Sequence, residues 1–310
     1  MILLAGIPTE PPLASVIDRL GELGVPSLFF NQRGFDDSHL VWSVRGGRID
    51  GQLTVAGRGY DLSAFTGVYA RLMDDRLLPE LDGEPAESER RRRCRRLHDG
   101  LVGWIDQAPG RVVNRFREMG SNASKPYQAQ LIRRHGFRVP ETLVTNHPAS
   151  VRAFAARHSR VVYKSISGFR SIVSELGATD LDRLDALHAC PVQFQAYVPG
   201  FDVRVHTVGE EAFATRIDSP GTDYRYADHG EGGTVLQPYD LPEELADRCR
   251  RLSAGLGLSF AGIDLRITPD NVVYCFEVNP SPAFTYYEVH TGQPISLGLA
   301  RFLAQPSPSS

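Results

Sequence analysis

Near the C-terminus, two apolar segments joined by a short turn carry three oxygen-bearing side chains. The segments are residues 262–268 and 272–280. Side chains alternate between the two faces of a strand, so Glu277 and Asn279 point the same way, and Asp264 on the neighbouring strand can point toward them. Carboxylate and amide oxygens suit Mg²⁺, which usually takes further ligands from nucleotide phosphates. The pattern therefore predicts a magnesium site; the alternative is a hairpin with two solvent-facing acids.

The composition is ordinary for a globular protein and argues against several classes of function. The chain has 310 residues, of which 42% are hydrophobic and 23% are charged, so it has room for two or three compact units. A formal net charge of −3 offers no electrostatic basis for binding nucleic acid or an anionic membrane. No apolar run approaches the roughly 18 residues of a membrane-spanning helix. We therefore expect no nucleic-acid partner and no membrane association.

The four cysteines are scattered along the chain and form no Cys-x-x-Cys pair: Cys94, Cys190, Cys249 and Cys275. We expect them to be small buried hydrophobic residues in a reducing compartment, and not a zinc site or a disulfide framework. The apolar start of the chain lacks the basic segment and the cleavage site of a signal peptide. These features predict a cytoplasmic protein.

The apolar periodicity predicts three units in order, and no dinucleotide-binding fingerprint follows the first strand. The first unit, 1–116, is an α/β unit with strands at 2–7, 27–30 and 68–71, a helix over 13–20 and a hairpin within 41–60 that turns at Gly46-Gly47. The second, 117–190, has helices over 125–136 and 151–157 and strands at 139–145 and 161–164. The third, 191–304, has helices over 242–256 and 295–304 and a hairpin at 258–279, and 305–310 is a frayed tail.

A basic run, Arg90–Arg96, is interrupted only by a cysteine. It could be a patch for nucleic acid. However, apolar residues within and after it recur at helical spacing: Cys94, Leu97, Leu101, Trp104 and Ile105. The arginines are therefore interpreted as the solvated outer face of an amphipathic helix.

Two lysines are placed where an anion could bind. Lys164 ends an apolar strand and precedes a turn of small residues that includes Ser167 and Gly168. Such a turn offers backbone N–H groups beside the cation, as a triphosphate requires. Lys125 opens a helix, whose first N–H groups also favour anions. Each lysine alone is more often a surface residue than a ligand.

Residues 192–205 combine a strand with polar residues that suit a nucleoside. The strand backbone could bond the edge of an adenine. Asp202 follows Pro-Gly and is placed to accept hydrogen bonds from ribose hydroxyls. Arg204, and Arg216 further along, supply additional cations.

Taken in order, these pieces resemble the ATP-grasp superfamily over residues 114–303. The most similar branch contains the ribosomal-protein glutamate ligases and the ligases that crosslink graspetides. In that family two lysines hold the phosphates, which implies this role for Lys125 and Lys164. An adenine-framing hinge follows, which resembles the run Gln195, Ala196, Tyr197 and Val198. The family's glutamate in this hinge is Ala196 here.

Further motifs of the family match residues in the last third of the chain. An Asp-x-Arg pair corresponds to Asp202 and Arg204, and a loop in which an arginine reaches the phosphates is similar to Asp223-Tyr224-Arg225. The metal-binding residues correspond to Asp264, Glu277 and Asn279. The phosphate loop at 167–171 departs from the family because it is short and has one glycine.

The resemblance implies an α+β ATP-grasp fold, in which an N-terminal α/β domain precedes two α+β subdomains that sandwich ATP. It also implies an ATP-dependent carboxylate–amine ligase that forms an amide or ester through an acyl phosphate and releases ADP. Two Mg²⁺ ions, or Mn²⁺, would assist. Arg204, Arg225 and Arg216 are the catalytic candidates, since phosphoryl transfer depends on cations and positioning.

Other readings remain open from the residues alone. The same scaffold could carry a small-molecule kinase that phosphorylates a hydroxyl, or a nucleotide-binding module without turnover. The expected partners are ATP, a carboxylate substrate that could be a peptide or an amino acid, an amine or hydroxyl acceptor, and a second copy in a homodimer. The loops 218–236 and 281–293 are expected to build the acceptor site. Arg71 and His206 have open roles.

Overall fold

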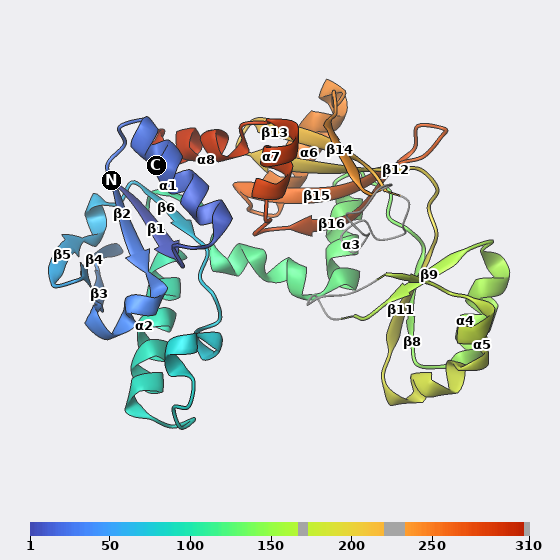
Figure 1. Ribbon diagram of the computed structural model, residues 1–310, viewed down its shortest axis with the longest axis horizontal. Coiled ribbons are helices and arrows are strands. Elements are labelled where there is room, and N and C mark those ends of the chain that lie inside the picture. Colours follow the sequence, from blue (N-terminus) through green and yellow to red (C-terminus); the bar gives the residue numbers. More distant parts are fainter. Residues whose placement is uncertain (167–172, 220–232, 307–310) are drawn as a thin grey trace.

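The computed structural model describes residues 1–166, 173–219 and 233–306 (Figure 1). The N-terminal unit is built on a four-stranded parallel sheet with the order β2 (Ser27–Asn31), β1 (Ile2–Gly6), β6 (Gly67–Ala70) and β7 (Arg111–Val113). Every residue of β1 and β6 is buried, because apolar side chains cover both faces of this sheet. Helix α1 (Pro11–Glu22) contributes its buried side chains to the cluster on one face.

In place of the expected two-stranded hairpin, this unit has a three-stranded antiparallel sheet. It comprises β3 (His39–Arg45), β4 (Arg48–Val55) and β5 (Arg58–Asp61). Gly46 and Gly47 form the predicted turn, with φ of 56° and 77°. Two successive positive φ values match the twist of a tight hairpin and favour glycine. A second turn at Ala56-Gly57, which the sequence analysis did not predict, adds the third strand.

Helix α2 (Glu89–Ile105) carries the basic run and confirms the predicted amphipathic helix. Its buried residues are Cys94, Leu97, Leu101, Trp104 and Ile105, the five that the spacing indicated. Three of the four cysteines are buried as expected. Cys190 is exposed, which corrects the expectation for that residue.

The central unit has an antiparallel sheet with the order β10 (Ser174–Glu175), β9 (Val161–Lys164), β11 (Val192–Ala196) and β8 (Thr142–Thr145). Helix α4 (Pro148–Arg157), helix α5 (Ala178–Asp182) and a 3-10 helix at Leu184–Ala189 accompany it. A small core of Val151, Phe154, Val161, Leu184 and Phe194 fills one face. Since Gln193 lies opposite Lys164 in the register, these two side chains share the other face.

The C-terminal sheet has five antiparallel strands in the order β14 (Val235–Pro238), β13 (Glu211–Asp218), β12 (Phe201–Val208), β15 (Phe260–Ile267) and β16 (Val273–Asn279). Helix α6 (Glu243–Gly255) packs on one face. Helix α8 (Ile295–Ala304) packs on the other and also contacts α1, so it joins this sheet to the N-terminal unit (Figure 1). Helix α7 (Thr285–Thr291) lies within 281–293, where the sequence analysis expected a loop.

Helix α3 (Lys125–Arg134) follows a 3-10 helix at Phe116–Ala123 and packs against β16. The division at 116 and 190 remains a prediction; packing places α3 with the C-terminal sheet, and β11 pairs with β8 and β9. Further 3-10 helices lie in the N-terminal unit: Gln32–Asp37, Leu62–Ala64, Asp75–Leu77 and Pro79–Leu81. In the described ranges, none of the helices has the length and apolar character needed to cross a membrane.

Candidate functional site

The acid pair of the β15–β16 hairpin forms as the sequence indicates. Asp264 lies directly opposite Glu277 and Gly262 lies opposite Asn279. The register shifts between Asp264 and Leu265, which next pairs with Cys275, so one residue of β16 is left over. A bulge of this kind reverses the alternation of faces. It allows Cys275 to point into the core while Glu277, two residues later, joins Asp264 on the other face.

A cation from a different element contacts each carboxylate of this pair. Lys125 Nζ, at the start of α3, lies 3.0 Å from Glu277 Oε2. Arg204 Nη1, on β12, donates to Asp264 Oδ1 at 2.6 Å. The side chains of Lys125 and Arg204 are only 11% and 7% exposed, so both ion pairs are shielded from solvent. Ion pairs in such surroundings interact more strongly than pairs on the surface.

The charges around Glu277 set its protonation. Burial alone would raise the pKa of its carboxyl, but Lys125, then Lys164 and Arg204, outweigh this and lower the pKa below its ordinary value. Glu277 is therefore an anion at neutral pH. Lys164, at the end of β9 in the central sheet, is therefore close enough to the hairpin for its charge to act on Glu277. The structure thus brings two lysines and an arginine from three elements around one acid pair.

Gly262 makes room for the Arg204 side chain. A Cβ at this position would lie 2.2 Å from Arg204 Nη2 and 2.5 Å from its Cζ. Any side chain here would displace the guanidinium that pairs with Asp264. The sequence analysis included this position only as the start of the segment 262–268.

Two buried amide side chains fix the hairpin, and the sequence analysis did not single out either for a role. Gln128 on α3 donates to Val278 O at 2.8 Å and accepts from Val278 N at 2.9 Å, so its amide pairs with the edge strand as another strand would. Asn114 donates to the carbonyls of Phe260 and Pro280, both at 2.6 Å. Val278 and Pro280 flank Asn279. A glutamine one helical turn after Lys125 was the available signal, since it must point the same way as that lysine.

We expect Gln128→Leu to destabilise the fold by about 2–3 kcal/mol, because it leaves the buried amide and carbonyl of Val278 without partners. ATP turnover should fall with it, since β16 then no longer holds Glu277 and Asn279 in place. Urea unfolding and ADP release measure the two effects. Gln130→Leu is the matched control, because Gln130 is exposed on the same helix. Equal stability of the two variants would contradict this role for Gln128.

The hinge run lies beside a cleft of about 490 Å³. The amides of Ala196 and Tyr197 already donate to the carbonyls of Glu141 and Arg160, at 2.9 and 3.0 Å. The side chain of Gln195 is bonded to Thr142. Within the described ranges, the amide of Val198 has no hydrogen-bond acceptor. The cleft is lined by Arg160, Tyr197, Gly200, Phe201, Asp202, Ile217, Asp218, Ser219, Gly233, Val235 and Arg266.

Asp202 lies at the wall of this cleft in a bidentate pair with Arg266. Both contacts, Nε to Oδ1 and Nη2 to Oδ2, are 2.8 Å. Arg266 also donates to the carbonyl of Val198 at 3.1 Å. Arg266 thus ties the hinge to the C-terminal sheet and orients the carboxylate that the sequence analysis assigned to ribose.

Arg216 does not join the cations around the acid pair. It lies opposite Val203 in the register, and therefore on the other face of the sheet from Arg204. There it pairs with Asp218 at 2.9 Å and lies over the Phe201 ring. Three further candidates, Ser167, Gly168 and Arg225, lie outside the described residues.

The two residues with open roles occupy buried positions. His206 has no exposed surface, and burial, with a smaller effect of Arg204, lowers its pKa well below the usual value. It is a neutral ring that stacks on Phe260 and meets Tyr287 edge to face, out of reach of a substrate in this conformation. Arg71 pairs with Glu10 and donates to the carbonyl of Pro282 at 3.2 Å. It therefore links the N-terminal unit to the loop after Asn279.

Comparison with known proteins decides the family. The RimK-like ATP-grasp domain matches residues 123–303, which includes every described residue around the acid pair. The chain belongs to this family. It is 24% identical over 176 residues to the α-aminoadipate–LysW ligase LysX of Sulfurisphaera tokodaii. That match covers 52% of this chain and 60% of LysX, so it spans less than two thirds of that relative.

Solved structures of ATP-grasp proteins extend the similarity to nearly the whole chain. The macrocyclase MdnC of Microcystis aeruginosa MRC, solved with its precursor peptide MdnA, is 26% identical, with a TM-score of 0.80 over 97% of this chain and 98% of MdnC. The ATP-grasp ligase PsnB, solved with a minimal precursor, Mg and ADP, is 27% identical, with a TM-score of 0.79 over 97% of this chain and 96% of PsnB. The predicted fold and family are therefore confirmed.

Proposed function

We propose that this protein is an ATP-dependent carboxylate–amine ligase that releases ADP and acts on a peptide. The observation that carries the proposal is the meeting of Lys125, Lys164 and Arg204 around Asp264 and Glu277. Cations suit the triphosphate, and the acid pair suits the metal that accompanies it. The peptide is favoured because MdnC and PsnB, which align over almost the full chain, were solved with precursor peptides. LysX, by its name, is also a ligase.

The residues fit the binding of magnesium by their chemistry. Asp264, Glu277 and Asn279 offer hard oxygen ligands on one patch, and the lowered pKa keeps Glu277 ionised. Among the described residues, no group of three or more His, Cys, Asp or Glu side chains is placed to hold a metal, so the third protein ligand would be the Asn279 amide oxygen. Mg²⁺ held there, as two ions in our proposal, would neutralise phosphate charge.

The proposed reaction has two steps. A substrate carboxylate oxygen attacks the γ-phosphorus of ATP, the bond to the β-phosphate oxygen breaks, and an acyl phosphate and ADP result. An amine nitrogen then attacks the acyl carbon, phosphate leaves, and the nitrogen loses a proton to form the amide. Lys125 and Lys164 hold the phosphate oxygens, and Arg204 stabilises the charge that spreads over the transferred group. Arg225 joins this group in the prediction from the sequence.

The adenine would bind in the cleft beside the hinge. The amide of Val198 is the donor available to the base, and Asp202, oriented by Arg266, accepts from the ribose. The Tyr197 ring contacts Arg160, whose Cζ lies 3.7 Å from the ring centre, and Arg266, whose Cζ lies 5.7 Å from it. These contacts fix the wall against which the nucleotide packs.

Trapping with hydroxylamine tests the ligase proposal. An acyl phosphate is electrophilic at carbon, so with ATP and the true carboxylate substrate, hydroxylamine should be captured as a hydroxamate while ADP is released. Acidic peptides, free glutamate and free aspartate are the first carboxylates to screen. The Arg204→Gln variant is the matched control and should give little of either product. If a hydroxyl compound instead yields a stable phosphate ester and no carboxylate yields a hydroxamate, the protein is a kinase.

A further inference from the structure

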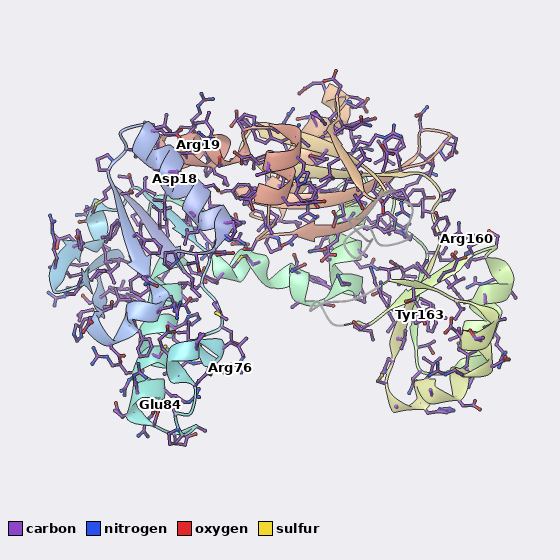
Figure 2. The ribbon with its side chains drawn as sticks, in the orientation of Figure 1. Asp18, Arg19, Arg76, Glu84, Arg160 and Tyr163 are labelled. Carbon is purple, nitrogen blue, oxygen red and sulfur yellow. The ribbon has the colours of Figure 1, made fainter. Side chains whose placement is uncertain are left out.

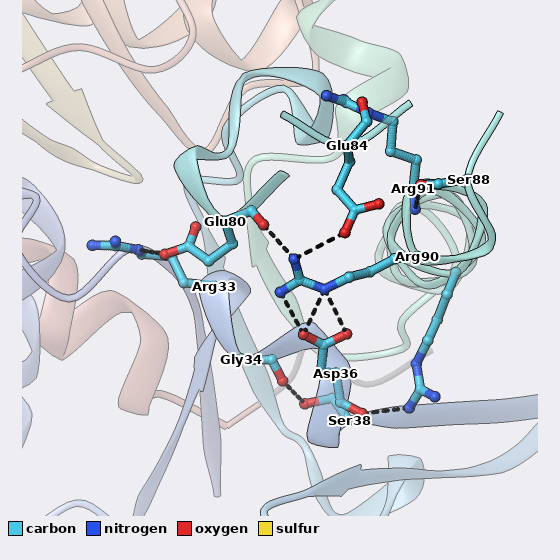
Figure 3. Close-up of polar contacts among 10 residues, drawn as sticks. Arg33, Gly34, Asp36, Ser38, Glu80, Glu84, Ser88, Arg90 and Arg91 are labelled. Carbon is cyan, nitrogen blue, oxygen red and sulfur yellow. Dashed lines mark hydrogen bonds and ion pairs between the residues drawn. The ribbon is translucent and has the colours of Figure 1, made fainter. Parts of the chain in front are cut away.

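The proposed ligase chemistry does not involve the basic run of α2. The contacts of its arginines divide this run into two parts. On one side, Arg90 is saturated: it pairs with Asp36 at 2.8 Å and Glu84 at 3.6 Å and donates to the carbonyl of Glu80 (Figure 3). Its side chain ties α2 to the neighbouring segments. Of the other arginines of the helix, four line a cavity, namely Arg91, Arg92, Arg95 and Arg96, whereas Arg93 donates to the carbonyl of Asp36.

This cavity has a volume of about 550 Å³ and lies between α2 and the 3-10 helices at 75–77 and 79–81. Its volume is within the range of ligand pockets, roughly 300–1,000 Å³. Five arginines face two carboxylates in its lining, which comprises Asp75, Arg76, Leu81, Glu84, Ala86, Arg91, Arg92, Arg95 and Arg96. A concave surface with this excess of cations attracts anions.

The positive charge of the cavity is only partly neutralised. Arg91 is held by the carbonyls of Leu81 and Glu84, at 2.7 and 3.0 Å, and forms no ion pair with any described carboxylate. Its guanidinium is therefore fixed in place with its charge uncompensated. Arg95, by contrast, pairs with the buried Asp75 at 2.9 Å.

Arg92 and Arg96 share a single carboxylate. Both pair with Glu89, at 3.3 and 2.5 Å, and the Glu89 side chain is 71% exposed. Exposed ion pairs contribute little to stability and exchange partners easily. These two guanidinium groups can therefore turn to an incoming carboxylate, to which arginine bonds in a bidentate manner.

We propose that this cavity binds the acidic side chains of a peptide substrate, with Arg91, Arg92 and Arg96 as the groups that contact the carboxylates. This inference deepens the proposed function and rests on it, because the proposed function is what makes the bound peptide a substrate. An acidic peptide is favoured over nucleic acid because MdnC and PsnB, which align over almost the full chain, were solved with precursor peptides. In the view of Figure 2, Arg76 lies on the edge of the N-terminal unit toward the central unit and Tyr163.

Binding without ATP tests this site separately from ligation. The probe is a fluorescein-labelled peptide of six Glu-Ser repeats, compared by anisotropy with its Gln-Ser counterpart. The full-length protein should bind the glutamate peptide at least about tenfold more tightly than the glutamine peptide, since charge-assisted hydrogen bonds are the stronger ones. Arg92→Gln/Arg96→Gln should lose this preference and keep its thermal midpoint, because both side chains are mostly exposed.

The charge-matched control is Arg133→Gln/Arg134→Gln, which removes two exposed arginines from α3. It should bind the glutamate peptide as the unaltered protein does. Equal binding of the two peptides, or equal loss in the two double variants, would overturn the proposal. Displacement of the peptide by free glutamate at the same carboxylate concentration would assign the cavity to a small carboxylate. Tighter binding of a single-stranded oligo-uridine than of the glutamate peptide would assign it to nucleic acid.

Discussion

Glu277→Gln should reduce ATP turnover by a factor on the order of 10²–10³, because a carboxylate that binds a catalytic metal supplies several kcal/mol at tenfold per 1.36 kcal/mol. The amide keeps the shape of the side chain but removes its charge. It also removes the partner of Lys125, which is 3.0 Å away and little exposed. ADP release with a carboxylate substrate measures the loss, and calorimetric titration with Mg²⁺ and ADP measures the metal contribution independently.

Glu244→Gln is the matched control for this variant. Glu244 is exposed in the first turn of α6, the helix that packs on the other side of the C-terminal sheet, so turnover should be unchanged. The urea midpoint of Glu277→Gln, measured alongside, gives the part of the loss that is structural, since the variant leaves Lys125 without its carboxylate. Full turnover in Glu277→Gln would show that the acid pair is structural.

Asn114→Ala should lower the free energy of unfolding by about 3–5 kcal/mol, because it leaves several buried backbone groups without partners at roughly 1–3 kcal/mol each. The side chain is 3% exposed. It donates to the carbonyls of Phe260 and Pro280 and accepts from the amides of Ser259 and Phe260, at 2.9 and 3.1 Å. It is therefore fully bonded at the point where the N-terminal unit meets the C-terminal sheet.

Urea unfolding with an unchanged slope checks this prediction. Asn146→Ala, at an exposed position, is the control and should change stability by less than about 0.5 kcal/mol. Asn114 also donates to the carbonyl of Pro280, which follows Asn279. At intermediate urea, the turnover of the variant should therefore fall more steeply than its folded fraction. A stability loss below that of Asn146→Ala would show that water replaces the amide at no cost.

Patterns confined to one segment were read correctly from the sequence. The five buried residues of α2 and the strands of the β15–β16 hairpin follow from helical and strand periodicity, because burial on one face imposes those periods. The closing helix, Ile295–Ala304, was predicted with the same bounds. Helix α7 was missed because its seven residues, rich in Tyr and Thr, lack a clear apolar period.

The residues of the candidate site could be predicted from the sequence, but the ion pairs between them could not. The sequence placed Asp264 and Glu277 on adjacent strands and singled out Lys125 and Arg204 as cations, and the resemblance to ATP-grasp proteins then implied their roles. Which cation meets which acid depends on how α3 and β12 pack against the hairpin. Arg216 illustrates the limit, since a shift of one residue in register would move it to the face of Arg204.

The sequence by itself determined the class of this protein: strands and helices of the right period, and acids, lysines and arginines in the order of an ATP-grasp protein. Only the tertiary structure decided that a bulge turns Glu277 away from the core, that Gln128 and Asn114 hold its strand, and that four arginines of α2 line a cavity. The physical reason is the range of the interactions. Periodicity reports the burial of neighbours along the chain, whereas the pairing of buried polar groups depends on elements far apart in sequence, which meet only when the units pack.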